Sequence, residues 1–299
     1  MMNPLKLFLT PEYLFRPTQI IVRFKRAFFA PTRELEPVKL PWGATILVRP
    51  AETIGSNIWY YGVFDLIVAE AIDRLLDAGE TAIDIGANIG QMTSLMSRKA
   101  EKTGKVYAFE PHPEIFAELS ANMQLLNNRK HFAPVSLYNL GLSDHEGAAE
   151  MEIDPNWAGN RGLGKIATRD AKVGAQTLEI QLNSLDKILG RDLKVDFCKM
   201  DVEGHELKVA HGAAHLLSQG RIRDIIFEDQ NPFPSELQKL LLECGYTIFS
   251  MHHRLLAPLL MPIVKSVPLK GRDRPDFLAT LNPKRAVERF RRLGWRVLM

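Results

Sequence analysis

A glycine-rich turn in the first half of the chain is the part of the sequence best suited to hold a ligand. An apolar run from Ala82 to Ile85 leads into Gly86-Ala87-Asn88-Ile89-Gly90, and a helix-like run follows. A second apolar run ends at Glu110. A glycine turn lets a ligand approach the backbone, and an acid at the next strand end can accept two hydrogen bonds from a ribose diol. The pattern predicts a nucleoside-containing cofactor at the carboxyl edge of a parallel sheet.

The residues inside and before this turn bear on which nucleoside it holds. The dinucleotide fingerprint G-x-G-x-x-G uses its second glycine to make room for a pyrophosphate, and Asn88 stands at that place here. Asp84 precedes the turn, where an anion repels a pyrophosphate but suits a ligand that carries an ammonium group. These features favour S-adenosylmethionine over NAD. The alternative is an α/β turn that binds no ligand.

Further carboxylates follow two later strand-like runs. Asp201 ends the run 195–200, and Glu228 and Asp229 end the run 224–227. At neighbouring strand ends they could act as a general base for a hydroxyl group, or hold a divalent cation that acidifies the hydroxyl. The alternative is that they cap turns and helix starts.

His205, at the start of the next helical pattern, is another candidate base. A lone histidine at such a place is more often structural. Glu203, two residues earlier, is expected to cap the same helix.

The bulk composition narrows the classes of function. The chain has 299 residues, of which 46% are apolar and 24% charged, and its net charge is +3. These values suit one large globular domain with appendages and predict no nucleic-acid partner. Cys198 and Cys244 lack metal or redox spacing, so we expect free thiols in a reducing compartment. No signal peptide and no run of roughly 18 apolar residues is evident, so we expect a cytoplasmic protein.

Alternating strand-like and helix-like patterns predict an α/β fold. We expect strands at 81–86, 105–110, 135–140, 195–200, 224–227, 246–250 and 277–281, and helices at 63–77, 91–97, 113–127, 204–218 and 235–243. Strands that alternate with helices imply right-handed crossovers and a parallel sheet. No helical pattern lies between the last two strands, so we expect an antiparallel hairpin at the sheet edge, with an apolar loop over 255–264.

Two β-rich segments lie outside this alternation. We expect a hairpin over 37–50, with a turn at Pro41-Trp42-Gly43. A β-rich insert is expected over 148–182, where strands 148–153 and 177–182 flank a glycine- and charge-rich loop.

Five groups of residues, in this order, resemble the FkbM family of methyltransferases. They are Ile83-x-Asp84-x-Gly86-Ala87-Asn88-x-Gly90, Ala108-Phe109-Glu110-Pro111, Leu142-Ser143-Asp144, Leu182-Asn183-Ser184-Leu185-Asp186 and Lys199-Met200-Asp201-Val202-Glu203-Gly204-His205-Glu206. Ile83 replaces the more usual valine, and the resemblance covers roughly residues 40–282.

This resemblance implies a fold, a cofactor and an acceptor. The fold is the Rossmann-like class I methyltransferase fold, with a seven-stranded, mostly parallel sheet, an antiparallel edge hairpin and helices on both faces. The methyl donor is S-adenosylmethionine, and the acceptor is a hydroxyl of a sugar, glycolipid or natural-product scaffold.

Roles for single residues follow from their places in such a fold. Asp84 is expected to orient the methionine ammonium, directly or through water, and Asn88 to supply an amide contact. Gly86 and Gly90 are expected to allow close backbone approach, and Glu110 to bind the ribose hydroxyls.

The adenine and the transferred methyl group need further partners. Asp144 matches a position where such folds often use an acid for the adenine amine, and Ser143 is the nearby alternative. Both could instead cap a turn. The candidates for catalysis are Asp201, Glu228 and His205.

The two ends of the chain lie outside the resemblance. We expect an N-terminal leader, hairpin and cap helix over 1–78, a methyltransferase domain over 79–282 and a basic tail over 283–299. The tail has six lysines or arginines against Glu288, mixed with Val287, Phe290, Leu293 and Trp295. A basic face beside exposed apolar residues suits peripheral contact with an anionic membrane. The alternative is a helix packed on the domain with its arginines solvated.

Two rival functions are weighed against methyl transfer. A nicotinamide-dependent oxidoreductase shares a related sheet, but Asn88 and the terminal strand pair argue against it. A non-catalytic cofactor-binding protein is less consistent with the intact set of Asp84, Glu110 and Asp201.

Overall fold

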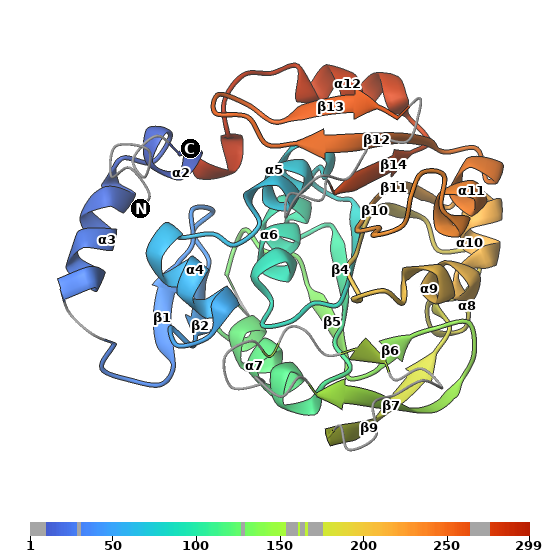
Figure 1. The fold of residues 1–299 in the computed structure, drawn as a ribbon, viewed down its shortest axis with the longest axis horizontal. Helices are drawn as coiled ribbons and strands as arrows, with labels where there is room; N and C mark the ends of the chain where they lie inside the picture. The colour runs from blue at the N-terminus through green and yellow to red at the C-terminus, as the bar shows by residue number, and fades with distance from the viewer. Residues whose placement is uncertain are drawn as a thin grey trace.

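A central β-sheet with helices on both faces organises the chain (Figure 1). The computed structural model describes residues 10–28, 31–126, 129–153, 161, 165–166, 176–263 and 276–299. In these residues the sheet has eight strands. In spatial order they are β13 (Leu259–Pro262), β12 (Thr247–His252), β14 (Phe277–Thr280), β11 (Ile222–Phe227), β10 (Val195–Met200), β3 (Thr81–Ile85), β4 (Lys105–Phe109) and β5 (Val135–Tyr138). The predicted α/β architecture is confirmed.

The middle of the sheet is parallel, as predicted. Five neighbouring strands, from β5 through β4, β3 and β10 to β11, run in the same direction. Every residue of β10 is buried, and so are four of the five residues in each of β3 and β4. Strands covered on both faces are continuous apolar runs in sequence, which is why the sequence locates them. Their carboxyl ends meet at one edge of the sheet.

The sheet has one strand more than the sequence predicts. β13 lies in the predicted loop 255–264 and pairs antiparallel with β12. Pro262 ends β13, and on an edge strand the missing N–H of a proline costs little. β14 pairs antiparallel with both β11 and β12. The predicted antiparallel pairing of 246–250 with 277–281 is therefore confirmed, but β13 forms the edge.

Helices cover both faces of the sheet. They are α5 (Leu66–Leu75), α6 (Gln91–Ala100), α7 (Pro113–Gln124), α8 (Leu185–Leu189), α9 (Glu206–Gly212), α10 (Ala214–Ser218), α11 (Glu236–Glu243) and α12 (Pro283–Phe290). Side chains of α5, α6 and α12 share one apolar cluster with β3 and β14. Side chains of α9, α10 and α11 share a second cluster with β10 and β11.

The predicted helix over 204–218 is divided into α9 and α10, which meet at Ala213. Gly212 lies against the chain that follows Leu142, and an ideal Cβ at Gly212 would lie 1.9 Å from the carbonyl oxygen of Ser143. This close approach requires a glycine at the end of α9. Glycine also lowers helix propensity, which is consistent with the division of the helix at this point.

The N-terminal segment packs beside the glycine turn. It contains α2 (Pro11–Leu14), α3 (Thr18–Phe28), the antiparallel hairpin β1 (Glu36–Lys39) and β2 (Thr45–Val48), and α4 (Thr53–Tyr61). The hairpin is as predicted, whereas α4 has no counterpart among the predicted elements. The Arg26 guanidinium lies 3.9 Å from the centroid of the Trp59 ring, which ties α3 to α4.

The insert forms a second sheet with strand order β6 (Gly141–Leu142), β9 (Gln176–Asn183), β7 (Gly147–Ile153) and β8 (Lys165–Ile166). β7 and β9 are antiparallel and match the predicted strands. β8 lies where a loop is predicted, and apart from Arg161 and Gln176 the rest of that loop lies outside the described residues. Met151, Ile180 and Leu182 form a small apolar core of this sheet.

Two buried charges of α5 hold the C-terminal segment. The side chains of Glu70 and Arg74 are fully buried and form an ion pair of 2.6 Å. Arg74 donates hydrogen bonds to the carbonyl oxygens of Arg289, Arg292 and Gly294 at 2.6–2.8 Å. Glu70 accepts the backbone N–H of Val297 at 2.9 Å, at the short 3₁₀ helix Arg296–Leu298. The last residues of the chain therefore pack into the apolar core.

The tail helix is thus packed on the domain, as the second reading expects. Phe290 and Trp295 are buried. Arg285 and Arg289 form ion pairs with Asp77. The second reading expects solvated arginines, and these two differ from it. Among the helices that the structure describes, none combines the length and the apolar character needed to cross a bilayer.

Replacing Arg74 with Met should lower the free energy of unfolding by about 3–5 kcal/mol, because the Glu70 carboxylate is then buried without its cation. Chemical denaturation followed by circular dichroism measures this loss. Arg98→Met is the matched control, because Arg98 is partly exposed and its ion pair with Glu101 is long, at 3.8 Å. A loss at Arg74 no larger than the control's would contradict the assigned role.

Candidate active site

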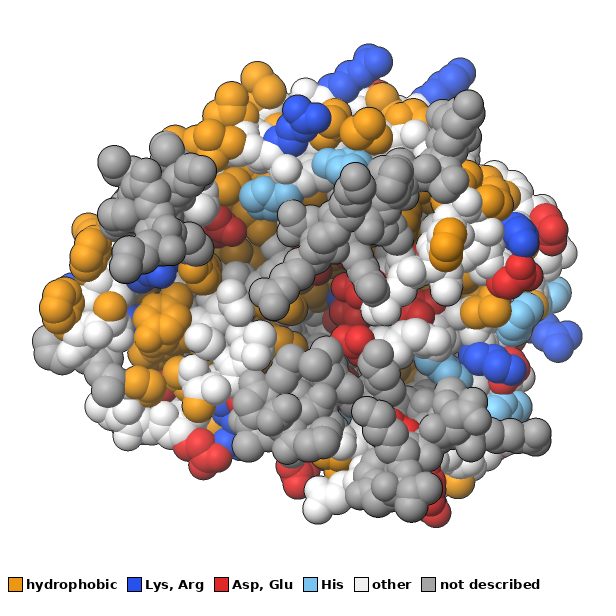
Figure 2. Space-filling model, viewed as in Figure 1, with side chains coloured by type: hydrophobic (Ala, Val, Ile, Leu, Met, Phe, Trp, Pro, Cys, Tyr) orange, Lys and Arg blue, Asp and Glu red, His pale blue; other side chains and the backbone are white. Residues whose placement is uncertain are grey.

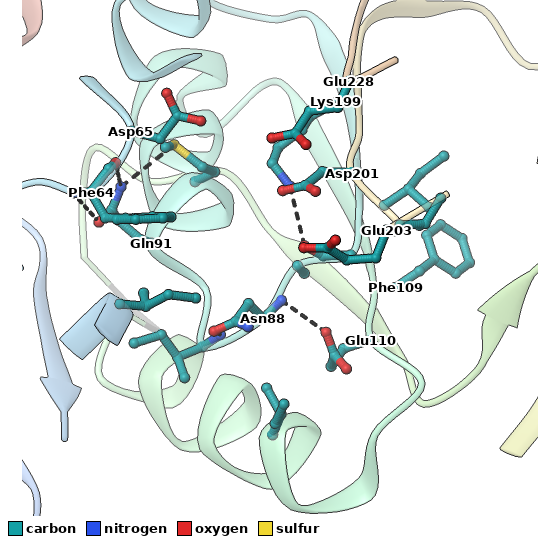
Figure 3. Close-up of a pocket in the computed structure, with 18 of the residues that line it drawn as sticks. Phe64, Asp65, Asn88, Gln91, Phe109, Glu110, Lys199, Asp201, Glu203 and Glu228 are labelled. Carbon is teal, nitrogen blue, oxygen red and sulfur yellow. Dashed lines mark hydrogen bonds and ion pairs between the residues drawn. The ribbon is translucent and has the colours of Figure 1, made fainter. Parts of the chain in front are cut away.

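A cavity of about 870 Å³ opens where β3, β4, β10 and β11 end. Ligands of open α/β sheets bind in the crevice beyond the carboxyl ends of the strands. Of the residues predicted from sequence, those that line the cavity are Gly86, Asn88, Glu110, Asp201 and Glu228 (Figure 3). Those outside its lining are Asp84, Gly90, Ser143, Asp144 and His205.

The glycines of the turn serve packing inside the protein, which differs from the predicted reason for them. Gly86 and Gly90 both have positive φ angles, 75° and 89°. An ideal Cβ at Gly86 would lie 2.0 Å from the carbonyl oxygen of Asp201, and one at Gly90 would lie 2.7–2.8 Å from Leu119 and Met123. The turn therefore needs glycine to lie against the end of β10 and against α7.

Glu110 is held at the cavity wall by the backbone. Its two carboxylate oxygens accept the N–H groups of Asn88 at 3.0 Å and of His112 at 2.9 Å. Burial raises the pKa of Glu110 to about 7, although both hydrogen bonds oppose this shift. Phe109 and Ile115 line the same cavity and give it an apolar wall. Glu110 thus places a carboxylate that can accept further hydrogen bonds beside an apolar wall.

The side chain of Lys199 links the carboxyl ends of β3 and β10 (Figure 3). Its ammonium donates to the carbonyl oxygen of Gly86 at 3.2 Å and pairs with Asp201 at 3.2 Å and Asp84 at 3.6 Å. Asp84 also accepts a hydrogen bond from Thr93 at 2.6 Å. Burial alone would lower the pKa of Lys199, but Asp201 and Asp84 outweigh it and the pKa is raised. Asp84 thus faces the lysine and α6, whereas the sequence predicts that it faces the cofactor.

Besides Glu110, five carboxylates share the cavity lining with Lys199, and they are Asp65, Asp201, Glu203, Glu228 and Asp276. Burial, followed by repulsion from Asp201 and Glu203, raises the pKa of Glu228 to about 7. Burial raises the pKa of Asp65 to about 6. Burial and the neighbouring Asp65 also raise the pKa of Asp276. The site therefore contains carboxyl groups that exchange protons near neutral pH.

Asp65 and Asp276 are absent from the predicted site. Asp65 is the N-cap of α5 and accepts the N–H of Val68 at 3.3 Å, and an aspartate before a helical pattern is a typical N-cap signal. Asp276 precedes β14, which pairs antiparallel with β11 so that Phe277 lies opposite Phe227. An antiparallel strand begins where its parallel neighbour ends, which brings Asp276 close to Glu228.

Left-handed backbone conformations are concentrated in this cavity. In the described chain four non-glycine residues have positive φ angles, and Asp65, Asn88 and Glu203 among them line the cavity. Such conformations cost about 1–3 kcal/mol each and persist where the surroundings fix them. Glu203 is thus a cavity residue, while Glu206 accepts the N–H groups of Val202 and Gly204 at 3.3 and 3.1 Å. These hydrogen bonds hold the turn before α9, whose N-cap residue is His205 rather than Glu203.

Ser143, Asp144 and His205 form a separate cluster away from the cavity lining. Ser143 is fully buried and its hydroxyl lies 3.0 Å from the His205 ring. Asp144 pairs with Lys208 at 2.7 Å and with His145 at 2.7 Å, and the hydrogen bond from Lys208 lowers its pKa. β6 leads the chain into the second sheet before Ser143, which explains the separation. These contacts match the turn and structural alternatives for these residues.

The converging carboxylates do not form a recognisable metal site. Within the described residues, no group of three or more His, Cys, Asp or Glu side chains has a metal-binding arrangement. Asp229 is turned into its own loop, where it accepts the N–H of Asn231 at 2.9 Å. The Lys199 ammonium is the cation that pairs with Asp201. The divalent cation suggested by the sequence gains no support.

Comparison with known proteins decides the family. A model of the methyltransferase FkbM domain matches residues 84–248, more than half of the chain. The chain belongs to the FkbM methyltransferase family. It is therefore an S-adenosylmethionine-dependent methyltransferase, and the resemblance drawn from its motifs is confirmed. The match gives no support to a nicotinamide-dependent oxidoreductase.

Several relatives are methyltransferases. The hexuronic acid methyltransferase AglP of Haloferax volcanii is 32% identical over 197 residues, which cover 63% of this chain and 73% of the relative. The methyltransferase sdnD of Sordaria araneosa is 27% identical over 194 residues, covering 56% and 73%. The crystal structure of the methyltransferase FkbM from Methylobacillus flagellatus KT is 17% identical with a TM-score of 0.42, and the match covers 67% of this chain and 43% of that chain. The sequence matches establish the family.

Replacing Glu110 with Gln should weaken the binding of S-adenosylhomocysteine about tenfold or more, because charge-assisted hydrogen bonds contribute about 1.5–3 kcal/mol. In the wild type the affinity should also fall as the pH drops through about 7, where Glu110 takes up a proton and loses an acceptor oxygen. Calorimetric titration between pH 6 and 8.5 measures both effects. Glu114→Gln, at an exposed position nearby, is the control, and equal affinities and pH profiles for all three proteins would contradict the ribose role.

Proposed function

We propose that this methyltransferase transfers a methyl group from S-adenosylmethionine to a hydroxyl of a sugar, glycolipid or natural-product acceptor. The observation that carries the proposal is the presence of Glu110, Asp201 and Glu228 in one cavity. A relative named for a hexuronic acid acceptor adds support for a sugar.

The residues of the cavity fit the proposed cofactor. Glu110 offers carboxylate oxygens for a ribose diol, and Phe109, Ile115 and Leu142 offer apolar surface for adenine. The acidic end of the cavity, to which Asp65, Glu203 and Asp276 also contribute, suits the positive charge of the methionine ammonium and sulfonium groups. Asn88, whose N–H is bound by Glu110, fixes the turn beside them.

Glu228 is proposed as the general base. The cofactor, when bound, supplies an electrophilic methyl group on a positively charged sulfur. Glu228 accepts the hydroxyl proton as the acceptor oxygen bonds to the methyl carbon and the sulfur–carbon bond breaks. A pKa near 7 leaves much of Glu228 ionised at neutral pH while it is still basic enough to take the proton.

Asp201 is proposed to position the acceptor hydroxyl. Its side chain is partly exposed to the cavity, and one oxygen is fixed by Lys199 at 3.2 Å. The remaining acceptor capacity is available for a hydroxyl. The lining holds six carboxylates against Lys199 and Arg161, and Arg161 is already paired with Glu52 and Glu118. This excess of negative charge would repel an anionic acceptor, which favours a neutral hydroxyl over a carboxylate as the methylated group.

A screen of hydroxylated glycans and lipid-linked sugars, read by release of S-adenosylhomocysteine, identifies the acceptor. Each neutral sugar is paired with its uronic acid. Preference for the neutral member is expected, and methylation of the uronic carboxylate alone would contradict the hydroxyl assignment.

With an acceptor in hand, Glu228→Gln should lower kcat by about 10²–10⁴-fold. The wild-type rate should rise with pH through about 7 as Glu228 loses its proton, and the variant should lack this rise. Binding of S-adenosylhomocysteine should be retained. Glu243→Gln, on the exposed side of α11, is the control, and an unchanged pH profile in Glu228→Gln would place the base elsewhere.

Asp201→Asn should keep cofactor binding but lose most methyl transfer, because the amide carries no charge to pair with Lys199 or to orient the hydroxyl. Single-turnover kinetics alongside calorimetry separate these two effects. Asp192→Asn, at a fully exposed side chain, should behave as the wild type. Near-full turnover in Asp201→Asn would make Asp201 a structural residue.

A further inference from the structure

Large apolar side chains are exposed together beside the C-terminus. We call them the C-terminal patch, and they are Leu255, Leu256, Leu259, Met261, Leu293 and Met299, with exposed fractions between 37% and 80%. Single exposed apolar residues are normal on a protein surface, but a contiguous group indicates an interaction site.

Two segments that are distant in sequence, 254–261 and 293–299, build this patch as one surface. The N–H of Gly294 donates to the carbonyl oxygen of Leu256 at 3.0 Å, next to Leu293. The ring N–H of Trp295 donates to the carbonyl oxygens of Arg254 and Leu255 at 3.1 and 3.3 Å. An ideal Cβ at Gly294 would lie 3.0 Å from the methyl group of Met299. The patch is therefore held in place by the buried Trp295.

Positive charges border the patch on its solvent side. Exposed basic residues next to it are Arg254, Lys284, Arg291 and Arg292, against the single acid Glu288 on α12. Across the described chain no carboxylate lies within ion-pair distance of these four, whereas Arg285, Arg289 and Arg296 bind Asp77, Asp224 or Asp73. Figure 2 shows apolar and basic side chains together along the edge formed by β13 and α12.

We propose that the C-terminal patch docks this methyltransferase on an anionic lipid bilayer. The apolar side chains enter the headgroup region, and the four basic residues bind lipid phosphates and carboxylates. A second copy of the chain fits less well as the partner. Two patches face to face would bring Arg291 and Arg292 of one copy against the same two arginines of the other, and these like charges repel.

The patch adjoins the mouth of the cavity. His252 and His253 line the cavity, and Arg254 and Leu255 follow them directly. Docking through the patch brings the cavity close to the bilayer surface, where an acceptor sugar carried on a lipid is found. This last step rests on the proposed function, while the docking itself does not.

Vesicle co-sedimentation without cofactor or acceptor tests the docking. Vesicles of phosphatidylserine and phosphatidylcholine should pellet the full chain at low salt, and pure phosphatidylcholine vesicles or high salt should weaken binding. Arg291→Ala with Arg292→Ala should lower affinity about 25-fold, at about fivefold for each charge. Leu256→Ser with Leu293→Ser should abolish binding at high salt.

Matched controls come from other faces of the same chain. Lys102→Ala with Lys130→Ala removes two exposed charges, and Leu125→Ser with Leu242→Ser removes two apolar side chains exposed to a similar degree. Both controls should bind vesicles as the wild type does. Thermal unfolding and S-adenosylhomocysteine binding should be unchanged in all four double variants, which separates docking from the cofactor site.

Three outcomes would overturn the proposal. The first is absence of pelleting with anionic vesicles at low salt. The second is an equal loss of binding in the control and patch variants. The third is a dimer, seen by light scattering, that Leu256→Ser with Leu293→Ser dissociates in a protein that binds no vesicles.

Discussion

The buried ammonium of Lys199 is the interaction on which the candidate active site depends. It joins Asp84 in β3, the carbonyl of Gly86 in the turn and Asp201 after β10. Loss of the ammonium would leave the buried carboxylate of Asp84 without its cation, which costs about 3–5 kcal/mol. Because Gly86 has no Cβ, the Asp201 carbonyl can lie against the turn. Two motifs far apart in the sequence are therefore one structural unit, and neither keeps its geometry without the other.

The charge balance around this lysine gives the cavity its chemical character. Burial is the main reason why the pKa values of Glu228 and Asp65 rise to about 7 and 6. Repulsion among the carboxylates adds to this rise, because the ammonium of Lys199 cannot offset all of them. The positive φ angles of Asp65 and Glu203 show that the backbone is also held in place at this end of the cavity. Proton exchange near neutral pH is thus a property of the assembled cluster.

The sequence predicts what depends on local pattern and misses what depends on tertiary pairing. Strands buried on both faces, such as β10, are recognisable as apolar runs, and the glycine turn is recognisable by its spacing. β13 is missed because Pro262 suggests a loop, although an edge strand tolerates it. Ser143 and Asp144 directly follow β6, which lines the cavity, but their side chains bind His205 and Lys208 instead. Asp276 joins the cavity because β14 begins where β11 ends, which the predicted antiparallel pairing could have indicated.

The basic tail contains two groups of cationic side chains in different environments. Arg285 and Arg289 are four residues apart and therefore lie on one face of α12, where both bind Asp77. Lys284 lies off that face, and Arg291 and Arg292 follow the end of α12, so all three remain exposed. A net charge counted over the tail cannot separate the two groups. The division depends on which residues face Asp77 and on where α12 ends.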